Sequence, residues 1–339
     1  MALPATMTAL ILRQDGYAGG GDAAMPGDLS AYLDLAEIPL PQVGPGQALI
    51  KVSRAAVNPS DLLYVAGHYG QPRVKGRPAG FEGVGEVVAG DTPLIGQRVS
   101  FFGSGSGTWA DYALTDARMM IPLRPELRDE DGAGLIVNPV TAMAMFDIVR
   151  ADGAGSFIFT AGGSQLGKFL IGLGKDHGIA PIAVVRRVEQ VDALKALGAA
   201  DVLVSTAPDF ATKLAEVVAT HSPRILLDAV ADQISADIFF AMPRGACWIP
   251  YGRLATTPPA LTEIGQFIFM GKRIEGFWLS AWMRTTPVEK QGAVIAEVQA
   301  RFANGAWRTD ISDTLPLDQA LARFPEALSV KDAKLLLAP

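Results

Sequence analysis

The pattern of apolar and polar positions changes character about a third of the way along the chain. Up to about residue 125, apolar segments are short, rich in β-branched residues and separated by Pro and Gly clusters such as PLPQVGPGQ. Such segments are typical of strands in a mostly antiparallel sheet. We therefore predict a barrel-like β domain with strands at MTALILR, ALIKVSRAAV, GVGEVVAG, QRVSFFG and TWADYAL.

From about residue 130 the pattern alternates between strands and helices. Apolar strands are predicted at SFIFT, PIAVVRR, ADVLVS, RILLDAV, ACWIPYG and RIEGFWLS. This alternation indicates a parallel sheet with helices on its faces. The segments with helical periodicity cover residues 129–150, 164–177, 188–198, 209–220, 232–241, 262–271 and 287–304.

The last segment, DTLPLDQALARFPEALSVKDAKLLLAP, predicts a strand, a helix and a strand that return to the first domain. We therefore expect a two-domain α/β chain. One domain would contain residues 1–128 and 280–339, and the other residues 129–279. The Gly-rich segment DGYAGGGDAAMPGDLSAY precedes the second strand and predicts a surface loop without chemistry of its own.

Composition narrows the class of function. Lys and Arg number 29 against 35 Asp and Glu, a net charge of −6, so the chain has no electrostatic footprint for nucleic acid. A single Cys247 excludes an internal disulfide, and three scattered His residues argue against a zinc site. The first residues have no basic segment ahead of a long apolar run, and no window resembles a membrane span. We expect a cytoplasmic protein that does not bind membranes.

The strongest local motif is SFIFTAGGSQLGKFLIGLG, in which an apolar strand runs into a Gly-rich turn and a helix. Gly162, Gly163 and Gly167 would let a pyrophosphate approach the backbone at the helix N-terminus. The spacing departs from G-x-G-x-x-G because Gln165 stands where a middle glycine is often found. A glycine turn that serves only strand-to-helix packing is the alternative.

Two arginines extend this motif at the end of the next strand. NAD-preferring sites place an acidic residue there, whereas this chain has Arg186 and Arg187 after IAVV. Adjacent guanidinium groups suit a 2′-phosphate, which favours NADPH as the cofactor. The alternative is a pair of solvated arginines at a strand end.

Several segments together carry a family resemblance over essentially the whole chain. They are AAVNPSDLLYVAGHYG, PAGFEGVGEVV, GLIVNPVTAMAMF, ALKALGAADVL and EGFWLSAW. The chain resembles the zinc-free medium-chain dehydrogenase/reductase superfamily, most closely the mitochondrial-type 2-enoyl thioester reductases and next the quinone oxidoreductases. The resemblance implies a GroES-like β domain plus a Rossmann domain, with NADPH and substrate in the cleft. It also implies no metal, since Phe81 stands where zinc enzymes of the superfamily carry a histidine.

The resemblance implies a catalytic role for Tyr69 in GHYG. Hydride delivered to the β-carbon of an unsaturated thioester or ketone moves charge onto the carbonyl oxygen. A phenol can donate a hydrogen bond to that oxygen or a proton to the α-carbon. The alternative is that Tyr69 only packs a loop beside the site.

The resemblance also implies a set of cofactor contacts. Some of them have an alternative: Asn138 as a helix N-cap only, Phe277 and Trp278 as core residues only, and Lys334 as a solvated lysine near the C-terminus. The implied set comprises Asn138, Thr141, Gly162, Gly163, Ser164, Gln165, Leu166, Gly167, Arg186, Arg187, Tyr251, Gly252, Phe277, Trp278, Leu279 and Lys334.

These observations predict NADPH-dependent reduction of a carbon–carbon double bond conjugated to a carbonyl, with a 2-enoyl thioester as the leading substrate. Reduction of a quinone or a small enone is the alternative reaction. A non-catalytic NADPH-binding protein is an alternative of another class. By analogy with the superfamily, we expect a homodimer joined through edge strands in the region from ACWIPYG to RIEGFWLS.

Overall fold

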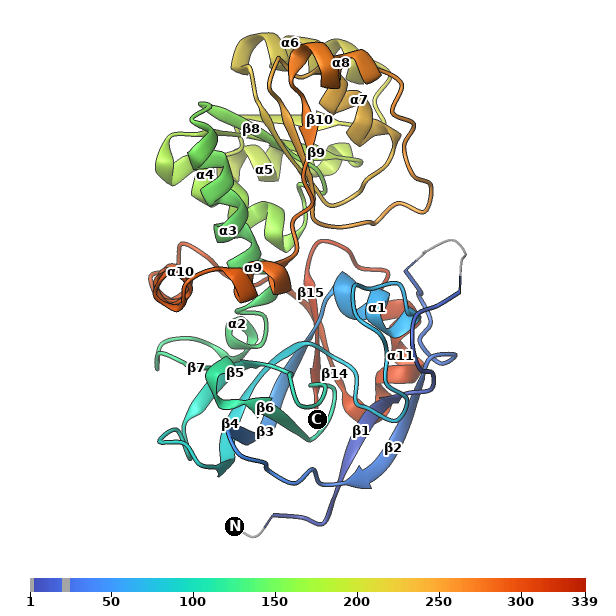
Figure 1. Ribbon diagram of the computed structural model, residues 1–339, viewed down its shortest axis with the longest axis vertical. Helices are drawn as coiled ribbons and strands as arrows, with labels where there is room; N and C mark the ends of the chain where they lie inside the picture. Colours follow the sequence, from blue (N-terminus) through green and yellow to red (C-terminus); the bar gives the residue numbers. More distant parts are fainter. Residues whose placement is uncertain (1–2, 20–24) are drawn as a thin grey trace. The chain divides into compact units, whose positions relative to one another are not determined.

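The computed structural model describes residues 3–19 and 25–339, which divide into two compact units (Figure 1). Unit 1 comprises Met1–Val137 and Glu297–Pro339, and unit 2 comprises Asn138–Ala296. The first division falls after the expected residue 128, because the short helix α2 (Asp129–Ala133) packs on strands of unit 1. The second falls after the expected residue 279, so residues 280–296 belong to unit 2.

Unit 1 is built on a seven-stranded, mostly antiparallel sheet of order β14-β15-β3-β4-β5-β7, with β6 paired to β3. The C-terminal segment returns to this sheet as predicted, because β15 pairs with β3. A two-stranded antiparallel sheet, β1-β2, completes the unit. The strands are β1 (Thr6–Leu12), β2 (Leu33–Pro39), β3 (Gln47–Val57), β4 (Glu82–Gly90), β5 (Arg98–Phe102), β6 (Tyr112–Asp116), β7 (Met120–Pro122), β14 (Ile311–Pro316) and β15 (Lys334–Ala338).

Two helices and two short 3₁₀ turns accompany this sheet. The helix α1 (Pro59–Ala66) follows β3, and α11 (Ala320–Ala327) lies between β14 and β15 in sequence, with short 3₁₀ turns η1 (Ala117–Met119) and η3 (Leu317–Gln319). The core includes the fully buried Trp109, whose ring lies 5.8 Å from that of Phe324 in α11. Trp109 also donates from Nε1 to the backbone oxygen of Ala56 at 3.0 Å. An aromatic side chain of this size therefore joins a helix to the sheet without an unpaired polar group.

The Gly-rich segment after β1 is more than the surface loop that its composition predicts. Residues 20–24 of it lie outside the described residues. Leu29, however, is fully buried in the core of unit 1, and Met25 packs against the same core. The prediction of a surface loop is wrong at these positions, because two apolar side chains among the polar residues are enough to anchor the segment.

Unit 2 has a six-stranded parallel sheet of order β10-β9-β8-β11-β12-β13, which is the strand order of a Rossmann domain. The predicted α/β alternation is confirmed. The strands are β8 (Ser156–Phe159), β9 (Ala180–Val185), β10 (Asp201–Val204), β11 (Ile225–Asp228), β12 (Cys247–Pro250) and β13 (Arg273–Ile274). The helices are α3 (Val137–Asp152), α4 (Gln165–His177), η2 (Val188–Gln190), α5 (Val191–Leu197), α6 (Phe210–His221), α7 (Gln233–Ala241), α8 (Ile264–Met270), α9 (Leu279–Thr285) and α10 (Val288–Ala303), the last of which continues into unit 1 from Glu297.

Two predicted elements differ from the structure. The helix expected over 129–150 is two helices, α2 and α3, separated at residues 134–136. The strand expected at RIEGFWLS is only the two-residue β13, and α9 begins at Leu279. Its neighbour β12 ends at Pro250, which has no N–H to extend a ladder, so the pairing stops early. Among the described residues, no helix is both long and apolar enough to span a bilayer.

Candidate active site

The glycine turn lies directly after β8 and leads into α4. Ser164 is the N-cap of α4, and its Oγ accepts the backbone N–H of Gly167 at 3.1 Å. A Cβ at Gly167 would lie 2.4 Å from the backbone oxygen of Gly162, and a Cβ at Gly162 would lie 2.8 Å from the Cβ of Ala183. These glycines are therefore required for the close passage of backbone between β8 and α4, as the packing alternative proposes. That passage leads into the N-terminus of α4, whose backbone N–H groups suit an anionic ligand, and the Gln190 side chain lies beside Gly163 in the turn.

The carboxylate of Asp228 organises the strand ends beside this turn. Asp228 is fully buried at the end of β11, where the strand order reverses between β8 and β11. Thr160 Oγ1 donates to it at 2.6 Å from the end of β8, and Trp248 Nε1 donates at 2.8 Å from β12. One carboxylate therefore connects three neighbouring strands at the point where Rossmann domains bind ligands. Its remaining donors are the backbone N–H groups of Val230 and Ala231 and the hydroxyl of Ser235.

Tyr251 and Gly252 are brought to the same place. The backbone N–H groups of both residues donate to the backbone oxygen of Asp228, at 2.8 and 3.3 Å. A Cβ at Gly252 would lie 2.8 Å from the backbone oxygen of Ala229, so this passage also requires glycine. Burial and the neighbouring Asp228 carboxylate raise the pKa of the Tyr251 phenol, which stays protonated.

Phe277, Trp278 and Leu279 follow at the next strand end. The backbone N–H of Phe277 donates to the backbone oxygen of Pro250 at 2.9 Å. This hydrogen bond holds the segment after β13 beside the end of β12. Phe277 and Trp278 are partly exposed, and the guanidinium of Arg284 lies 5.0 Å from the Trp278 ring centre.

The two arginines after β9 are exposed, and the backbone oxygen of Arg186 accepts from Thr206 Oγ1 at 2.7 Å. A groove of about 730 Å³ starts at these arginines and runs along β10. Its charged lining includes Arg186, Arg187, Lys195 and Lys213 as well as three acidic residues, and it contains none of the glycines of the turn.

Together these features fit a dinucleotide. The glycine turn leads into a helix N-terminus. The backbone of Tyr251 and Gly252 lies at the strand ends where the strand order reverses, and two guanidinium groups are exposed at the end of the adjacent strand. Gly162, Gly163 and Gly167 would hold the pyrophosphate, and Arg186 and Arg187 would hold a 2′-phosphate.

In unit 1, the carboxylate of Glu82 is fully buried and caps α3. Its Oε2 accepts the backbone N–H groups of Ile136 at 3.0 Å and Val137 at 2.8 Å. A negative charge there meets the positive end of the helix dipole. Because α3 begins at Val137, Asn138 lies inside the first turn of the helix. The alternative role of Asn138 as the helix N-cap is therefore wrong. Thr141 lies one turn further and is also buried.

Glu82 belongs to a buried cluster of four polar side chains with Asn58, Asp61 and Lys334. Asn58 Nδ2 donates to Glu82 Oε1 at 2.9 Å, and its Oδ1 accepts from Lys334 Nζ. Lys334 is only 5% exposed, so the alternative of a solvated lysine is wrong. Burial raises the pKa of Glu82 and lowers that of Lys334, while each charge opposes the shift of the other.

Asp61 makes the turn into α1. Its Oδ2 accepts the backbone N–H of Asn58 at 2.7 Å, whereas its buried Oδ1 has no hydrogen-bond partner. Burial, with a smaller contribution from the nearby Glu82 carboxylate, raises the pKa of Asp61 to about 7. This carboxyl group therefore titrates near neutral pH within the cluster.

Tyr69 lies a few residues beyond α1. The helix ends at Gly67, which adopts a left-handed conformation with φ of 82°, and the chain then turns through His68. Tyr69 is partly buried, and its ring lies 5.1 Å from that of the buried Phe81, the residue before Glu82. The tyrosine and the buried polar cluster are therefore attached to the same two segments of unit 1.

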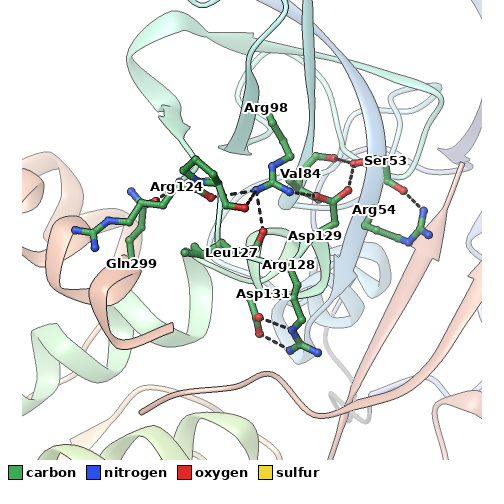
Figure 2. A network of polar contacts seen from close by, with 11 residues as sticks. Ser53, Arg54, Val84, Arg98, Arg124, Leu127, Arg128, Asp129, Asp131 and Gln299 are labelled. Carbon is green, nitrogen blue, oxygen red and sulfur yellow. Dashed lines mark hydrogen bonds and ion pairs between the residues drawn. The ribbon is translucent and has the colours of Figure 1, made fainter. Parts of the chain in front are cut away.

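A second polar network holds the segment that leads to α3 (Figure 2). Arg98 donates to Asp129 Oδ1 at 3.1 Å and to the backbone oxygen of Leu127 at 2.8 Å. Ser53 Oγ from β3 donates to the other oxygen of Asp129 at 3.1 Å. Arg128 and Asp131 form a two-pronged pair at 2.7 and 2.8 Å. These contacts secure α2 on the sheet, and α2 in turn places the amides that Glu82 accepts.

The structure thus groups the expected residues in two places. Those at Gly162–Gly167, Tyr251 and Gly252 surround the strand ends of unit 2, while Tyr69 and Lys334 belong to unit 1. Sequence reasoning missed Asp228 as an organising residue, although an acidic residue ending the apolar strand RILLD was a usable signal. It also missed Asn58 and Glu82, whose motifs were noted only for resemblance. No group of three or more His, Cys, Asp or Glu within 3–19 and 25–339 is placed to hold a metal ion.

Comparisons with known proteins agree with this organisation. Residues 44–125 match the alcohol dehydrogenase GroES-like domain. The mitochondrial enoyl-[acyl-carrier-protein] reductase of Bos taurus is 29% identical over 270 residues, covering 76% of this chain and 71% of the relative.

Solved structures extend the match to the whole chain. A candidate NADPH:quinone reductase from Mesorhizobium loti is 48% identical with a TM-score of 0.95, and the match covers 100% of both chains. A complex of Etr1p with NADP and crotonyl-CoA is 21% identical with a TM-score of 0.81, covering 98% of this chain and 100% of the other, and supports the fold alone. The chain belongs to the zinc-free medium-chain dehydrogenase/reductase superfamily, which confirms the family resemblance.

Proposed function

We propose that this chain uses NADPH to reduce a carbon–carbon double bond conjugated to a carbonyl, and that its principal substrate is a 2-enoyl thioester. The observation that carries NADPH-dependent chemistry is the glycine turn with two arginines at the end of the neighbouring strand. The names of its relatives, an enoyl-[acyl-carrier-protein] reductase and a candidate NADPH:quinone reductase, support this class of reaction.

The residues of this chain have separate tasks in such a reaction. When bound, NADPH supplies the hydride that forms a C–H bond at the β-carbon and is itself oxidised to NADP⁺. The electron pair of the double bond moves toward the carbonyl, where the Tyr69 hydroxyl stabilises the developing negative charge by donating a hydrogen bond. A proton then completes the α-carbon, either from Tyr69 or from water.

The buried cluster of unit 1 fixes the segment that leads into α3. Asn58, Asp61, Glu82 and Lys334 are each at most 5% exposed and bind one another rather than solvent. Through Glu82 they fix the start of α3, which carries Asn138 in its first turn and Thr141 at the start of the second. We propose that these two side chains, together with Lys334, contact the cofactor.

A second candidate function is reduction of quinones. It is favoured by the relative that is 48% identical over its full length, a candidate NADPH:quinone reductase. A quinone oxygen can take its proton from water, so Tyr69 would be dispensable for this reaction.

The decisive experiment measures NADPH oxidation at 340 nm with crotonyl-CoA and, in parallel, with 1,4-benzoquinone. It compares the wild type with Tyr69→Phe and with the control Tyr112→Phe, a partly buried tyrosine on β6 of the same unit. Turnover of crotonyl-CoA that collapses only in Tyr69→Phe supports the enoyl reductase. Quinone-only turnover that is indifferent to the substitution supports the second candidate, and NADPH binding without turnover of either supports a non-catalytic protein.

We also propose that the protein is a homodimer joined along β13. This strand lies at the edge of the parallel sheet, and the preceding helix α8 exposes Ile264, Ile268 and Phe269 by 56%, 69% and 72%. An unpaired strand edge beside an apolar helix face is the kind of surface that a second copy can cover with matching two-fold symmetry.

A further inference from the structure

The buried guanidinium of Arg73 joins three segments of unit 1 that are separate in sequence. Arg73 is 5% exposed. Its Nε donates to the backbone oxygen of Gly16 at 3.0 Å, and its Nη1 donates to Gln14 Oε1 at 2.8 Å and to the backbone oxygen of Val65 at 3.3 Å. Val65 is in the last turn of α1, where backbone oxygens have no partner within the helix. A cation at this helix end is also favoured by the helix dipole.

The backbone repeats the same connection. Gly16 and Arg73 exchange two backbone hydrogen bonds, at 3.0 and 3.1 Å, and the N–H of Ala18 donates to the oxygen of Gly67 at 2.8 Å. Asp15 Oδ1 accepts the N–H of Lys75 at 2.7 Å. The segment that follows β1 is therefore bonded to both ends of the loop Gly67–Arg73, next to α1 (Figure 1).

The fit at the first end of this loop is tight. Gly67 has φ of 82°, and a Cβ there would lie 2.6 Å from the backbone nitrogen of Ala18 and 2.6 Å from Cζ of Arg73. The guanidinium thus lies against Gly67 while its own backbone forms the other end of the loop. Arg73 closes the loop on itself, and the loop contains Tyr69.

We propose that Arg73 is a positioning residue for Tyr69, and that the segment Gln14–Ala18 supplies the fixed surface against which it acts. The inference rests on the role proposed above for Tyr69. A phenol that must donate to a developing oxyanion is effective only within a narrow range of positions, and a displacement of about 1 Å can cost on the order of 10²-fold in rate. The five donors of a planar guanidinium suit this task better than the single ammonium of a lysine.

The test is a double-mutant cycle of Arg73→Met with Tyr69→Phe, assayed with NADPH and crotonyl-CoA. In the wild-type background we expect Arg73→Met to lower kcat by about tenfold or more, with the Kd for NADPH changed less than about twofold. In the Tyr69→Phe background the same substitution should lower kcat by less than about twofold, because there is no phenol left to position. Arg73→Lys should recover part of the loss, and Arg118→Met, an exposed arginine of the same unit paired with Asp116, should have no effect. Equal losses in both backgrounds would overturn the proposal.

A second measurement does not depend on turnover. Hydrogen–deuterium exchange should be faster for the amides of residues 66–74 and for Ala18 in Arg73→Met than in Arg118→Met. Gln14→Ala, which removes one acceptor at the surface, should show a smaller change in the same direction and avoids the risk that Arg73→Met does not fold. Unchanged exchange would overturn the anchoring role of Arg73 even if the enzyme proves active. If exchange is faster in Arg73→Met but the wild-type protein reduces no enone, the anchoring role of Arg73 is supported and the proposed reductase function is wrong.

Discussion

Glu82 Oε2 accepts the backbone N–H of Val137 at 2.8 Å, so a carboxylate from β4 caps the helix that opens unit 2. The same side chain accepts from Asn58, which in turn accepts from Lys334. One fully buried carboxylate therefore fixes the start of a helix and, through Asn58, is connected to Lys334. Because charges in such surroundings are costly unless they are paired, each member of the cluster depends on the others.

We expect Glu82→Gln to destabilise the fold by about 1–3 kcal/mol, the usual cost of leaving a buried hydrogen-bonding group without its partner, because an amide offers one acceptor oxygen where the carboxylate uses two. The substitution keeps the shape of the side chain but leaves the Lys334 ammonium with less compensating charge. Urea unfolding followed by tryptophan fluorescence measures the change. Glu86→Gln, an exposed carboxylate on the same strand, is the control and should change stability by less than about 0.5 kcal/mol. Equal effects of the two substitutions would refute a stabilising role for the buried charge.

The stability of the protein should depend on the ionisation of Asp61. Burial raises the pKa of Asp61 to about 7 from the ordinary value of 3.8, so the folded state holds its proton more tightly than the unfolded state. The contribution of Asp61 to stability is fully present below about pH 4 and is lost as the pH rises through about 7. Asp61→Asn does not ionise and keeps an acceptor for the Asn58 N–H.

The free energy of unfolding of Asp61→Asn relative to wild type should therefore rise between pH 5 and pH 8, by on the order of a few kcal/mol. Denaturant unfolding at several pH values measures it. The exposed Asp91→Asn should show no such trend. A difference between Asp61→Asn and wild type that stays constant with pH would contradict the prediction.

Cofactor choice should depend on the arginines after β9. Arg186→Ala should weaken NADPH binding by about 1.5–3 kcal/mol and leave NADH binding nearly unchanged, because only NADPH carries the 2′-phosphate. Fluorescence titration with both cofactors measures the two affinities. Arg187→Ala and the double variant are needed as well, since either guanidinium can substitute for the other. If NADPH binding and NADH binding are weakened equally, the arginines do not determine the choice of cofactor.

Two glycines in unit 2 should respond in opposite ways to alanine. At Gly167 a Cβ would lie 2.4 Å from the backbone oxygen of Gly162, so Gly167→Ala should open the turn and weaken NADPH binding at least about tenfold. Gly292 is in the exposed middle of α10 with open space around its Cα. Gly292→Ala should stabilise the protein by about 0.5–1 kcal/mol without changing NADPH affinity. Calorimetry and titration test both, and wild-type NADPH affinity in Gly167→Ala would count against the turn as a phosphate site.

The oligomeric state should depend on the exposed face of α8. Phe269→Glu places a charge in the proposed interface and should convert a dimer to a monomer in light scattering at micromolar concentration. Val288→Glu, at a valine that is 77% exposed elsewhere in unit 2, should leave the mass unchanged. A wild-type protein that is already monomeric at this concentration would contradict the proposed dimer.

The order of strands and helices in unit 2 follows from the sequence pattern. The alternation of strands and helices after residue 130 and the glycine turn after SFIFT depend on periodicity and turn chemistry within a few residues, so both were predicted near their observed positions. The short β13 was not, because its end is decided by Pro250 on a neighbouring strand. The break between α2 and α3 likewise reflects the sheet to which α2 is attached.

The two kinds of domain, the glycine turn and the two arginines beyond it follow from the sequence, because each is encoded in adjacent residues. The burial of Lys334 against Asn58, 276 positions away, and the bond between Arg73 and Gly16 are visible only in the folded chain. Those partners meet because β15 pairs with β3 and because the segment after β1 folds back onto α1. Strand pairing and loop docking depend on the burial of apolar surface over the whole unit, which no local pattern specifies.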